Sequence, residues 1–230
     1  MKFKNAIMLI GESTRMRDKP FINILGKPMF LHGYDVMAGL FENIIFVCAD
    51  SVIDKLKKLP GNYNFNINDV RLVRDSENKG PVNAMYLGMK FILENFKDNL
   101  NDNLNDNYKC KNESSVFVTS CDMPLLNRAV IRHIGDLARG ADKSVVIING
   151  KFFEPLCAFY NMRDVTGALS KSRGVQNLSF RDLINIIEIV PVDVRALKKY
   201  DPDLLSLVNV NTEDDTTKIR KLIIKINIRA

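Results

Sequence analysis

The sequence predicts an α/β protein with three layers, in which helices cover both faces of a mostly parallel, Rossmann-like sheet. Short apolar runs alternate with longer segments of helical period, and the strand–helix unit occurs four times in succession. Units of this kind form a largely parallel sheet covered on both faces. The chain has 230 residues, of which 46% are hydrophobic and 26% charged. This mixture is usual for a globular protein and excludes a disordered or fibrous chain.

Five short apolar runs in the first 150 residues predict buried strands, at 6–10, 44–48, 70–73, 116–119 and 145–148. Segments with apolar residues at helical spacing predict helices at 28–41, 51–59, 82–96 and 125–138. Two of these helices follow a proline, which suits a first helical turn because the N–H that proline lacks has no partner there.

The order of elements changes after residue 150. Strands are expected at 152–160 and 188–193, helices at 162–172 and 178–187, a final strand at 204–210 and a C-terminal helix at 214–226. Because no flexible interdomain linker interrupts them, we expect a single domain over residues 1–230. Asparagine occupies every other position from 99 to 107, with Asp and Leu between. Such a stretch has too few apolar residues to offset the entropy of ordering, so residues 98–113 are predicted to form a mobile surface insertion.

The charge balance favours an anionic partner. The chain has 33 Lys and Arg against 27 Asp and Glu, which gives a net charge of +6, and its isoelectric point is near 9.1. The basic residues are mostly interspersed with acidic ones, so small phosphates are favoured over nucleic acid or a membrane surface. No apolar run approaches the ~18 residues that span a bilayer. The run at 6–10 is too short for a signal peptide.

The four cysteines, Cys48, Cys110, Cys121 and Cys157, form no CxxC pair and no zinc-like spacing. Three of them lie in apolar runs, as small core residues do. A reduced, cytoplasmic protein is therefore expected. Both histidines, His32 and His133, lie in predicted helices away from any motif, and are expected to be structural or surface residues.

The first segment that carries chemistry runs from Leu9 to Pro20. It follows a buried strand directly and contains Gly11, Ser13, Arg15 and Lys19 before the next helix. In an open α/β sheet, ligands bind beyond the carboxyl ends of the strands. Backbone N–H groups with Arg and Lys at that place can hold a polyphosphate. An ordinary polar connection is the alternative, because the segment matches neither GxGxxG nor GxxxxGK[ST].

The second segment places Asp122 at the end of the fourth strand, before Pro124. Magnesium prefers one or two carboxylates together with substrate phosphates, and a carboxylate at a strand end suits it. The alternative is that Asp122 caps the following helix.

Three further segments lie at or near the ends of predicted strands. The segment from Arg74 to Ala84 contains Gly80-Pro81, which predicts a turn and the start of a helix before it predicts a ligand-binding loop. Pro155 lies inside an apolar run and therefore predicts an edge strand. Asn209 and Asn211 are two residues apart and, in a strand, would point to the same side. Thr212 with its acidic neighbours is also a plausible helix cap.

The order of these segments resembles that of the molybdenum cofactor guanylyltransferases, which open with a pattern like L-A-G-G-x-S-x-R-M-G-x-D-K. The chain has Ile10-Gly11-Glu12-Ser13-Thr14-Arg15-Met16-Arg17-Asp18-Lys19, followed by Gly26-Lys27-Pro28. The later signatures of that family are D-S…G-P-L-A-G, C-D-x-P, P-x-x-A-x-Y and N-x-N-T. They correspond here to Asp75-Ser76…Gly80-Pro81-Val82-Asn83-Ala84, Cys121-Asp122-Met123-Pro124, Pro155-Leu156-Cys157-Ala158-Phe159-Tyr160 and Asn209-Val210-Asn211-Thr212. Five motifs in the same order cover nearly the whole chain.

This resemblance implies a fold of the nucleotide-diphospho-sugar-transferase type, with a nucleotide-binding N-terminal half and an acceptor-binding C-terminal half. It implies the transfer of GMP from GTP to the terminal phosphate of molybdopterin, with Mg²⁺ as cofactor and release of pyrophosphate. Transient contact with molybdoenzymes or with other proteins of the cofactor pathway is implied as well. The acceptor phosphate is then the nucleophile, which agrees with a sequence that shows no Ser–His or Cys–His constellation.

The resemblance also implies roles for individual residues. The triphosphate would be held by Leu9, Ile10, Gly11, Ser13, Arg15 and Lys19, and guanine and ribose would lie against Asp75, Gly80 and Pro81. Asp122 matches the magnesium ligand, and Arg15, Lys19 and Asp122 together match the catalytic groups. Pro155, Asn209 and Asn211 match residues near the acceptor, and the two asparagines also match residues near the metal.

The chain departs from the family pattern in its first loop, which is one residue shorter. Ile10 replaces the first glycine of the pair, and Arg17 replaces the glycine after Met. A Cβ atom at position 10 would hinder close approach of a phosphate to the backbone. Three alternatives therefore stay open: transfer from CTP to molybdopterin, transfer from GTP to cobinamide phosphate, or a non-catalytic nucleotide-binding protein. A further alternative, binding of nucleic acid or a membrane surface, rests on the basic and apolar residues at 218–226, which equally suit a packed helix with a solvated face.

Overall fold

The computed structural model describes residues 1–229 except 14, 60, 62, 97–113 and 172–177. The predicted insertion at 98–113 and Cys110 therefore lie outside the described residues, as does the last residue of the helix predicted at 162–172.

A seven-stranded sheet forms the middle of the molecule, with strand order β5-β4-β1-β6-β8-β7-β9. These strands are β1 (Phe3–Ile10), β4 (Phe41–Cys48), β5 (Arg71–Arg74), β6 (Ser115–Ser120), β7 (Ser144–Asn149), β8 (Phe152–Asn161) and β9 (Ile189–Asp193). The strands β5, β4, β1 and β6 are parallel, β8 is antiparallel to both of its neighbours, and β7 is parallel to β9. A separate two-stranded hairpin joins β2 (Asn23–Ile24) and β3 (Lys27–Pro28).

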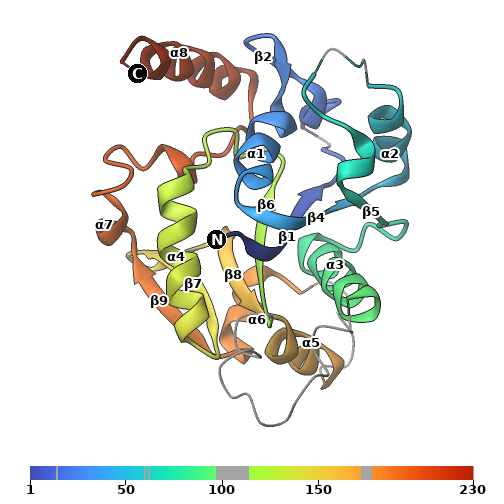
Figure 1. Cartoon of the computed structure of the whole chain (residues 1–230), viewed down its shortest axis with the longest axis vertical. Helices are drawn as coiled ribbons and strands as arrows, with labels where there is room; N and C mark the ends of the chain where they lie inside the picture. Colours follow the sequence, from blue (N-terminus) through green and yellow to red (C-terminus); the bar gives the residue numbers. More distant parts are fainter. Residues whose placement is uncertain (14, 60, 62, 97–113, 172–177, 230) are drawn as a thin grey trace.

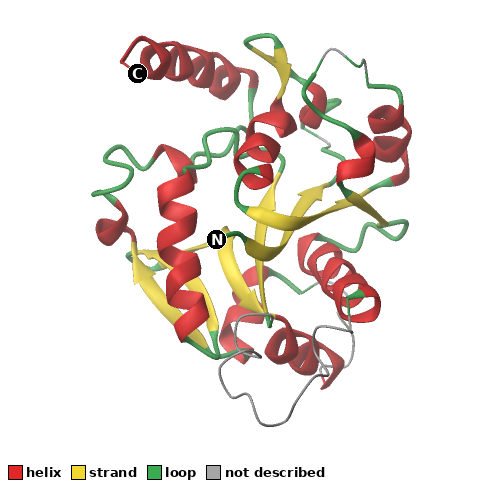
Figure 2. Cartoon of the chain, viewed as in Figure 1, coloured by secondary structure: helices red, strands yellow, loops and turns green. Residues whose placement is uncertain are grey.

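Helices cover both faces of this sheet (Figures 1 and 2). One face carries α1 (Met29–Ala38), α2 (Asp50–Lys57), α4 (Arg128–Gly140) and α7 (Val194–Leu197). The other carries α3 (Pro81–Asn95), α5 (Met162–Lys171) and α6 (Phe180–Ile186). Three short 3₁₀ turns, η1 (Lys19–Phe21), η2 (Ile67–Asp69) and η5 (Leu205–Leu207), and a last helix, α8 (Glu213–Arg229), complete the described elements. The three-layer α/β fold is confirmed.

The alternation of side chains along β1 shows why the sheet lies between two cores. Ala6, Met8 and Ile10 belong to the core under α1 and α4, whereas Ile7 and Leu9 belong to the core under α3 and α5. Successive side chains of a strand point to opposite faces, so a strand that is apolar at every position is buried on both. The continuous apolar run at 6–10 therefore predicts the central position of β1.

One predicted strand, at 204–210, is wrong. Leu204 has a φ of +53°, and the residues after it form the 3₁₀ turn η5. The buried carboxylate of Asp201 accepts hydrogen bonds from the backbone N–H groups of Leu205 at 3.0 Å and Ser206 at 2.8 Å. A side chain that binds nearby backbone groups competes with sheet pairing, and here it stabilises the turn.

The prediction that Pro155 marks an edge strand is also wrong, because β8 lies between β6 and β7. The pairing with β6 begins only at Cys157, and the pairing with β7 is irregular between Glu154 and Phe159. Pro155 thus lies where the ladder is interrupted on both sides, so the N–H that proline lacks costs no sheet hydrogen bond.

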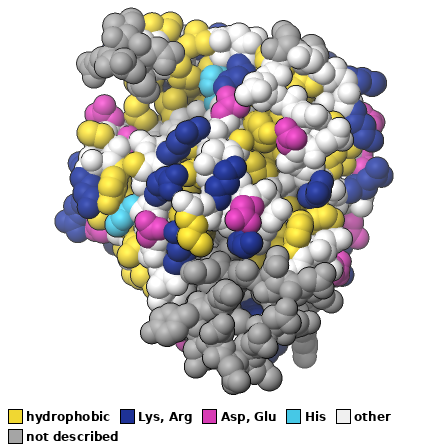
Figure 3. Space-filling view, viewed as in Figure 1, with side chains coloured by type: hydrophobic (Ala, Val, Ile, Leu, Met, Phe, Trp, Pro, Cys, Tyr) yellow, Lys and Arg dark blue, Asp and Glu magenta, His cyan; other side chains and the backbone are white. Residues whose placement is uncertain are grey.

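The C-terminal helix α8 packs against the β2–β3 hairpin (Figure 1). Its Ile219 is 1% exposed and forms a small core with Ile24, Met29 and Val210. This packing favours the interpretation of 218–226 as a packed helix with a solvated basic face. On the face shown in Figure 3, Lys and Arg side chains lie among acidic, polar and apolar ones. Among the described residues, no helix is long and apolar enough to cross a membrane.

Candidate active site

The carboxyl ends of the parallel strands β1, β4 and β6 meet at one edge of the sheet, and the polar segments of the sequence start there. The first loop, residues 11–18, follows β1, and Asp122 follows β6. Leu9 and Ser120 are partners in the ladder, and the N–H of Cys121 donates to the carbonyl of Leu9 at 3.1 Å. The sheet itself therefore sets the distance between the first loop and Asp122.

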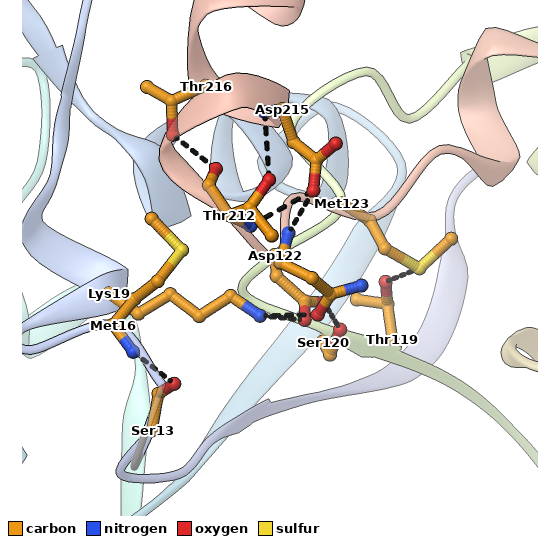
Figure 4. Close-up of polar contacts among 11 residues, drawn as sticks. Ser13, Met16, Lys19, Thr119, Ser120, Asp122, Met123, Thr212, Asp215 and Thr216 are labelled. Atoms are coloured by element: carbon orange, nitrogen blue, oxygen red, sulfur yellow. Dashed lines mark hydrogen bonds and ion pairs between the residues drawn. The ribbon is translucent and has the colours of Figure 1, made fainter.

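Lys19 connects the two segments. Its side-chain Nζ donates to Oδ2 of Asp122 at 2.6 Å (Figure 4) and to Oδ1 of Asn211 at 3.1 Å. These partners lie 103 and 192 residues away in the sequence. The ion pair is mostly withdrawn from solvent, with 11% of the Lys19 side chain and 19% of the Asp122 side chain exposed. An amine, a carboxylate and an amide from three segments thus form one polar cluster.

Asp122 is held on its other side by Ser120, whose hydroxyl donates to Oδ1. The helix-cap alternative for Asp122 is wrong: α4 begins at Arg128, and the side chain of Asn127 caps it by accepting from Ala129 N and Val130 N. The carbonyl of Asp122 accepts from the N–H of Val210 at 2.9 Å, which brings the following Asn211 to the cluster.

The oxygens of this cluster suit a magnesium ion in chemical type. Carboxylate and amide oxygens are hard ligands, and magnesium takes few of them from a protein when substrate phosphates supply others. The described residues contain no group of three or more His, Cys, Asp or Glu side chains that would hold a metal alone. Asp122 therefore fits a metal that substrate phosphates help to bind.

The first loop is shaped by its own hydrogen bonds. Ser13 accepts the N–H of Met16 at 3.1 Å through its hydroxyl, and Asp18 has a φ of +55° ahead of the turn η1. Asp18 pairs with Lys55 of α2, and this pairing lowers the pKa of the Asp18 carboxyl. Gly11 and Arg15 are exposed. The turn carries Lys19 inward to the cluster, while Arg15 stays outside it.

The two residues before this loop, Leu9 and Ile10, are buried in β1, with 6% and 0% exposure. The side chain of Ile10 lies in the core that contains Phe46 and Cys48. Its Cβ therefore faces the interior and does not cover the first loop, contrary to the expected hindrance.

Asp75, Gly80 and Pro81 lie together at another place on this edge, after β5, which is two strands from β1. Asp75 is buried, its Oδ1 accepts the N–H of Asn78 at 3.1 Å, and burial raises the pKa of its carboxyl. Gly80 has a φ of +93°, which favours glycine, and Pro81 begins α3. The structure gives these residues a local turn and does not join them to the Lys19 cluster.

Of the three residues matched to the acceptor, only Asn211 contacts the cluster. Asn209 is exposed and takes no part in the described hydrogen bonds of Lys19 and Asp122. Pro155 lies near the start of β8, just beyond the pairing with the end of β6. Thr212 caps α8, accepting the N–H of Asp215 at 3.1 Å, as predicted for a helix start.

Two cavities open beside the cluster of Lys19, Asp122 and Asn211. The first cavity, of about 270 Å³, lies between the first loop and α2, and Gly11, Ser13, Lys19, Ser51 and Lys55 are among its lining residues. The second cavity, of about 620 Å³, lies between the first loop and α8, and Arg15, Asn211, Thr212 and Arg220 are among its lining residues. Arg17 lines both.

Sequence reasoning missed Ser120, Lys55 and Arg220 as residues of this region. Ser120 stands two positions before Asp122, a spacing that places both on one side of an extended chain. Lys55 and Arg220 lie in helices, and no motif marks them.

The described cysteines and histidines take no part in the cluster. Cys48, Cys121 and Cys157 are free and buried, and burial raises the pKa of Cys121 and of Cys157 to about 12. They are thiols at neutral pH, not nucleophiles. His32 contacts the carbonyl of Ile24 at 3.0 Å and His133 packs against Tyr200, so both are structural, as predicted.

The sequence and the fold of this chain are similar to those of known proteins. The family model of the MobA-like NTP transferase domain matches residues 6–185. A molybdenum cofactor guanylyltransferase from Syntrophotalea carbinolica is 24% identical over 224 residues, which cover 96% of this chain and 92% of that protein.

Solved structures share the fold. Molybdopterin-guanine dinucleotide biosynthesis protein A from Archaeoglobus fulgidus has a TM-score of 0.70 at 20% identity, with 97% of this chain and 100% of that chain covered. The 4-diphosphocytidyl-2C-methyl-D-erythritol synthase from Anaerococcus prevotii has a TM-score of 0.63 at 13% identity, with 96% of each chain covered. Because the family model spans well over half of the sequence, the chain belongs to the family of MobA-like NTP transferase domains and is an enzyme of the nucleotidyltransferase class.

Proposed function

We propose that this protein transfers GMP from GTP to the terminal phosphate of molybdopterin, in the presence of Mg²⁺, and releases pyrophosphate. The observation that carries the proposal is the contact of Lys19 with both Asp122 and Asn211. These residues stand at three of the five motifs, and the fold joins them at the edge where ligands bind in open α/β sheets. A relative that covers almost the whole chain is a molybdenum cofactor guanylyltransferase.

The nucleotide would lie along the first cavity. Its phosphates would meet the backbone at Leu9, Ile10 and Gly11, together with the Ser13 hydroxyl and the Lys19 ammonium. Gly11 is exposed and the side chain of Ile10 lies in the core, so the backbone is accessible at Gly11, whereas Leu9 and Ile10 are buried. Guanine and ribose would lie farther along the edge, where Asp75, Gly80 and Pro81 form their turn.

Asp122 would hold Mg²⁺, with the amide oxygen of Asn211 beside it. When bound, the metal neutralises charge on the phosphates and orients them. Its protein ligands would be few, as expected where phosphates complete the coordination.

The remaining work of the site is positioning and charge neutralisation, which is most of what a protein contributes to phosphoryl-type transfer. Lys19 and Arg15 would offset the charge that develops on the transferring group. An oxygen of the acceptor phosphate forms the new bond to the α-phosphorus of GTP, and the bond from that phosphorus to pyrophosphate breaks. Pro155, Asn209 and Asn211 would face the acceptor. The nucleotide would thus be bound by the N-terminal half of a single domain and the acceptor by the C-terminal half.

The proposal places the reaction in the cytoplasm, where free thiols such as Cys48, Cys121 and Cys157 persist. The product would pass to molybdoenzymes or to other proteins of the cofactor pathway through transient contacts.

The test begins with binding. The thermal stability of the protein is measured with GTP, CTP, ATP and UTP, each with and without Mg²⁺. A ligand at 100 times its dissociation constant adds ~2.7 kcal/mol, which corresponds to a rise of very roughly 5–11 °C for a chain of this size. We expect the largest rise with GTP and Mg²⁺.

Turnover is then measured with molybdopterin as acceptor, by release of pyrophosphate and by the mass of the dinucleotide product. Activity with GTP that is lost on chelation of Mg²⁺ supports the proposal. A product formed only with CTP changes the donor, and no product with any nucleotide overturns the proposal.

A further inference from the structure

The second cavity has a wall that the family model does not cover. The match to that model ends at residue 185, whereas α8 begins at Glu213. This helix supplies Thr216, Thr217 and Arg220 to the lining, and the first loop supplies Arg15 and Arg17. Three arginines from two distant segments therefore surround a cavity of about 620 Å³.

The position of Arg220 is fixed by its neighbours. Ile219, the residue before it, is 1% exposed in the small core that joins α8 to the hairpin. The Nη2 atom of Arg220 donates to the carbonyl of Asn23 in β2 at 2.7 Å. A guanidinium has five N–H donors, and this bond uses one of them. Arg220 is thus anchored at both its backbone and its head while its side chain lines the cavity.

The charge of the second cavity suits an anion. Among the described residues, its lining includes Arg15, Arg17 and Arg220 against one carboxylate, that of Glu213. Arginine presents two parallel N–H groups that match two oxygens of a phosphate. Hydroxyl groups of Thr212 and Thr217 lie in the same wall. A phosphate ester is the ligand that this set of donors fits best.

The second cavity also adjoins the cluster of Lys19, Asp122 and Asn211. Lys19 lines the first cavity, and its hydrogen-bond partner Asn211 lines the second. In a displacement at phosphorus, the attacking and leaving oxygens lie roughly in line on opposite sides. If pyrophosphate leaves from the first cavity, on the α2 side of the first loop, the attacking phosphate must come from a different direction, and the second cavity opens on the α8 side of the same loop.

We infer that Arg220 binds the phosphate group of the acceptor and thereby selects acceptors that carry a terminal phosphate. This inference rests on the proposed function, because it takes the first cavity as the place of the nucleotide. It adds a specificity-determining residue from α8, a helix in which the sequence shows no motif.

The test compares Arg220→Gln with Lys221→Gln, which removes the same charge from the next residue of the same helix. Lys221 is exposed and does not line the second cavity. We expect Arg220→Gln to raise KM for molybdopterin about 10- to 100-fold, as for loss of a charge-assisted hydrogen bond, with KM for GTP changed less than about twofold. Arg220→Lys keeps the charge and is expected to recover part of the loss. An equal rise in both KM values, or the same effect in Lys221→Gln, overturns the inference.

A binding measurement separates this inference from the proposed function. Molybdopterin is titrated into the nucleotide-free protein, and the anisotropy of its pterin fluorescence is followed. Weaker binding of molybdopterin by Arg220→Gln, but not by Lys221→Gln, supports the inference even if the wild-type protein transfers no GMP. The lack of transfer would then overturn only the proposed function. Transfer by the wild type together with unchanged binding in Arg220→Gln overturns only the inference. A wild-type protein that neither binds molybdopterin nor transfers GMP overturns both.

Discussion

Two aspartates, Asp122 after β6 and Asp75 after β5, stand at strand ends on the same edge of the sheet, yet their surroundings differ. Asp122 accepts from the ammonium of Lys19 and the hydroxyl of Ser120, and Asn211 shares the same ammonium. Asp75 is buried without a cation in its described hydrogen bonds, and accepts a backbone N–H from Asn78. The first carboxylate lies in a charged cluster, whereas the second stabilises a turn.

The comparison shows that a strand-end carboxylate is not a site by its position alone. What distinguishes Asp122 is the set of groups that other strands and loops bring to it. Asp75 has only its own loop for partners, and burial raises the pKa of its carboxyl. The proposed roles follow from this difference: a metal and transferring phosphate at Asp122, and the shape of the nucleotide pocket at Asp75.

The largest effect is expected at Asp122, when Asp122 and Asp75 are each replaced by asparagine in separate variants. Asp122→Asn should lower kcat for GMP transfer at least ~10³-fold, since metal-assisted charge stabilisation contributes several kcal/mol and each 1.36 kcal/mol is tenfold. Asp75→Asn should keep kcat and raise KM for GTP less than about tenfold. Steady-state kinetics with circular dichroism spectra of both variants provides the measurement. Equal losses of kcat would remove the distinction between the two strand ends.

Lys19 and Lys55 both line the first cavity, but their surroundings differ. Lys19 lies in the cluster, and Lys55 forms an exposed pair with Asp18. Lys19→Met should lower kcat ~10²–10³-fold, the usual cost of removing one group that stabilises the transition state. Lys55→Met should cost less than about tenfold. Pyrophosphate release by the two variants is the readout, and a larger loss for Lys55→Met would place the reacting phosphate nearer to α2 than proposed.

A smaller effect is expected at the asparagine pair. Asn211→Ala removes one partner of the Lys19 ammonium and should lower the rate of transfer about tenfold, in line with the loss of one hydrogen bond to a charged group. Asn209→Ala should change the rate less than about threefold, because Asn209 is exposed and outside the described cluster. The rates of both variants are measured at saturating GTP. Should Asn209→Ala prove the more damaging, the acceptor contacts would lie at Asn209 and not at Asn211.

The smallest effect is on stability and depends on pH. Burial raises the pKa of Asp75 in the folded state, so the folded state binds its proton more tightly than the unfolded state does. The stability that the protonated carboxyl contributes is present below its unfolded pKa and is lost as pH rises through its folded pKa. The free energy of unfolding of Asp75→Asn should therefore rise relative to wild type as pH increases above the ordinary range for aspartate. Urea unfolding at several pH values measures this difference.

Asp193→Asn is the control, because its free energy of unfolding relative to wild type is expected to change with pH in the opposite direction. The hydrogen bonds of Arg195 lower the pKa of Asp193 to about 2. The stability contributed by the Asp193 carboxylate is present above its unfolded pKa and is lost as pH falls toward about 2, so this variant should weaken relative to wild type as pH rises. If both differences ran in the same direction, the environment described for Asp75 would be wrong.

Much of the fold could be predicted because local pattern and burial agree in the first 150 residues. A run that is apolar at every position, such as 6–10, has to be buried on both faces, which places β1 in the middle of a sheet. The apolar pattern gave a wrong prediction at 204–210. Apolar residues also occur there, but the hydrogen bonds of the Asp201 carboxylate stabilise a turn of the backbone. Hydrophobicity alone does not reveal such a competing hydrogen bond.

The candidate site could be predicted in part. The positions of Lys19 and Asp122 after two predicted strands indicate a ligand site, and both residues lie in the cluster. The sequence predicts Arg15 beside them, but Arg15 lies exposed on the wall of the second cavity, because the turn η1 directs Lys19 inward and leaves Arg15 outside. The direction of a side chain within an irregular loop depends on the backbone of that loop, which has no periodic signal in sequence.

The sequence by itself determined the alternation of strands and helices, the free and buried state of the described cysteines, and the order of the polar segments along the chain. These properties depend on residue type and spacing, which local sterics and burial convert into structure. Only the tertiary structure decided which polar segments meet: Lys19 reaches Asp122 and Asn211, while Asp75 stays apart. It also placed Arg220 at the second cavity. Contacts between residues 103 or 192 positions apart depend on how strands pair and helices pack, and no local pattern records that.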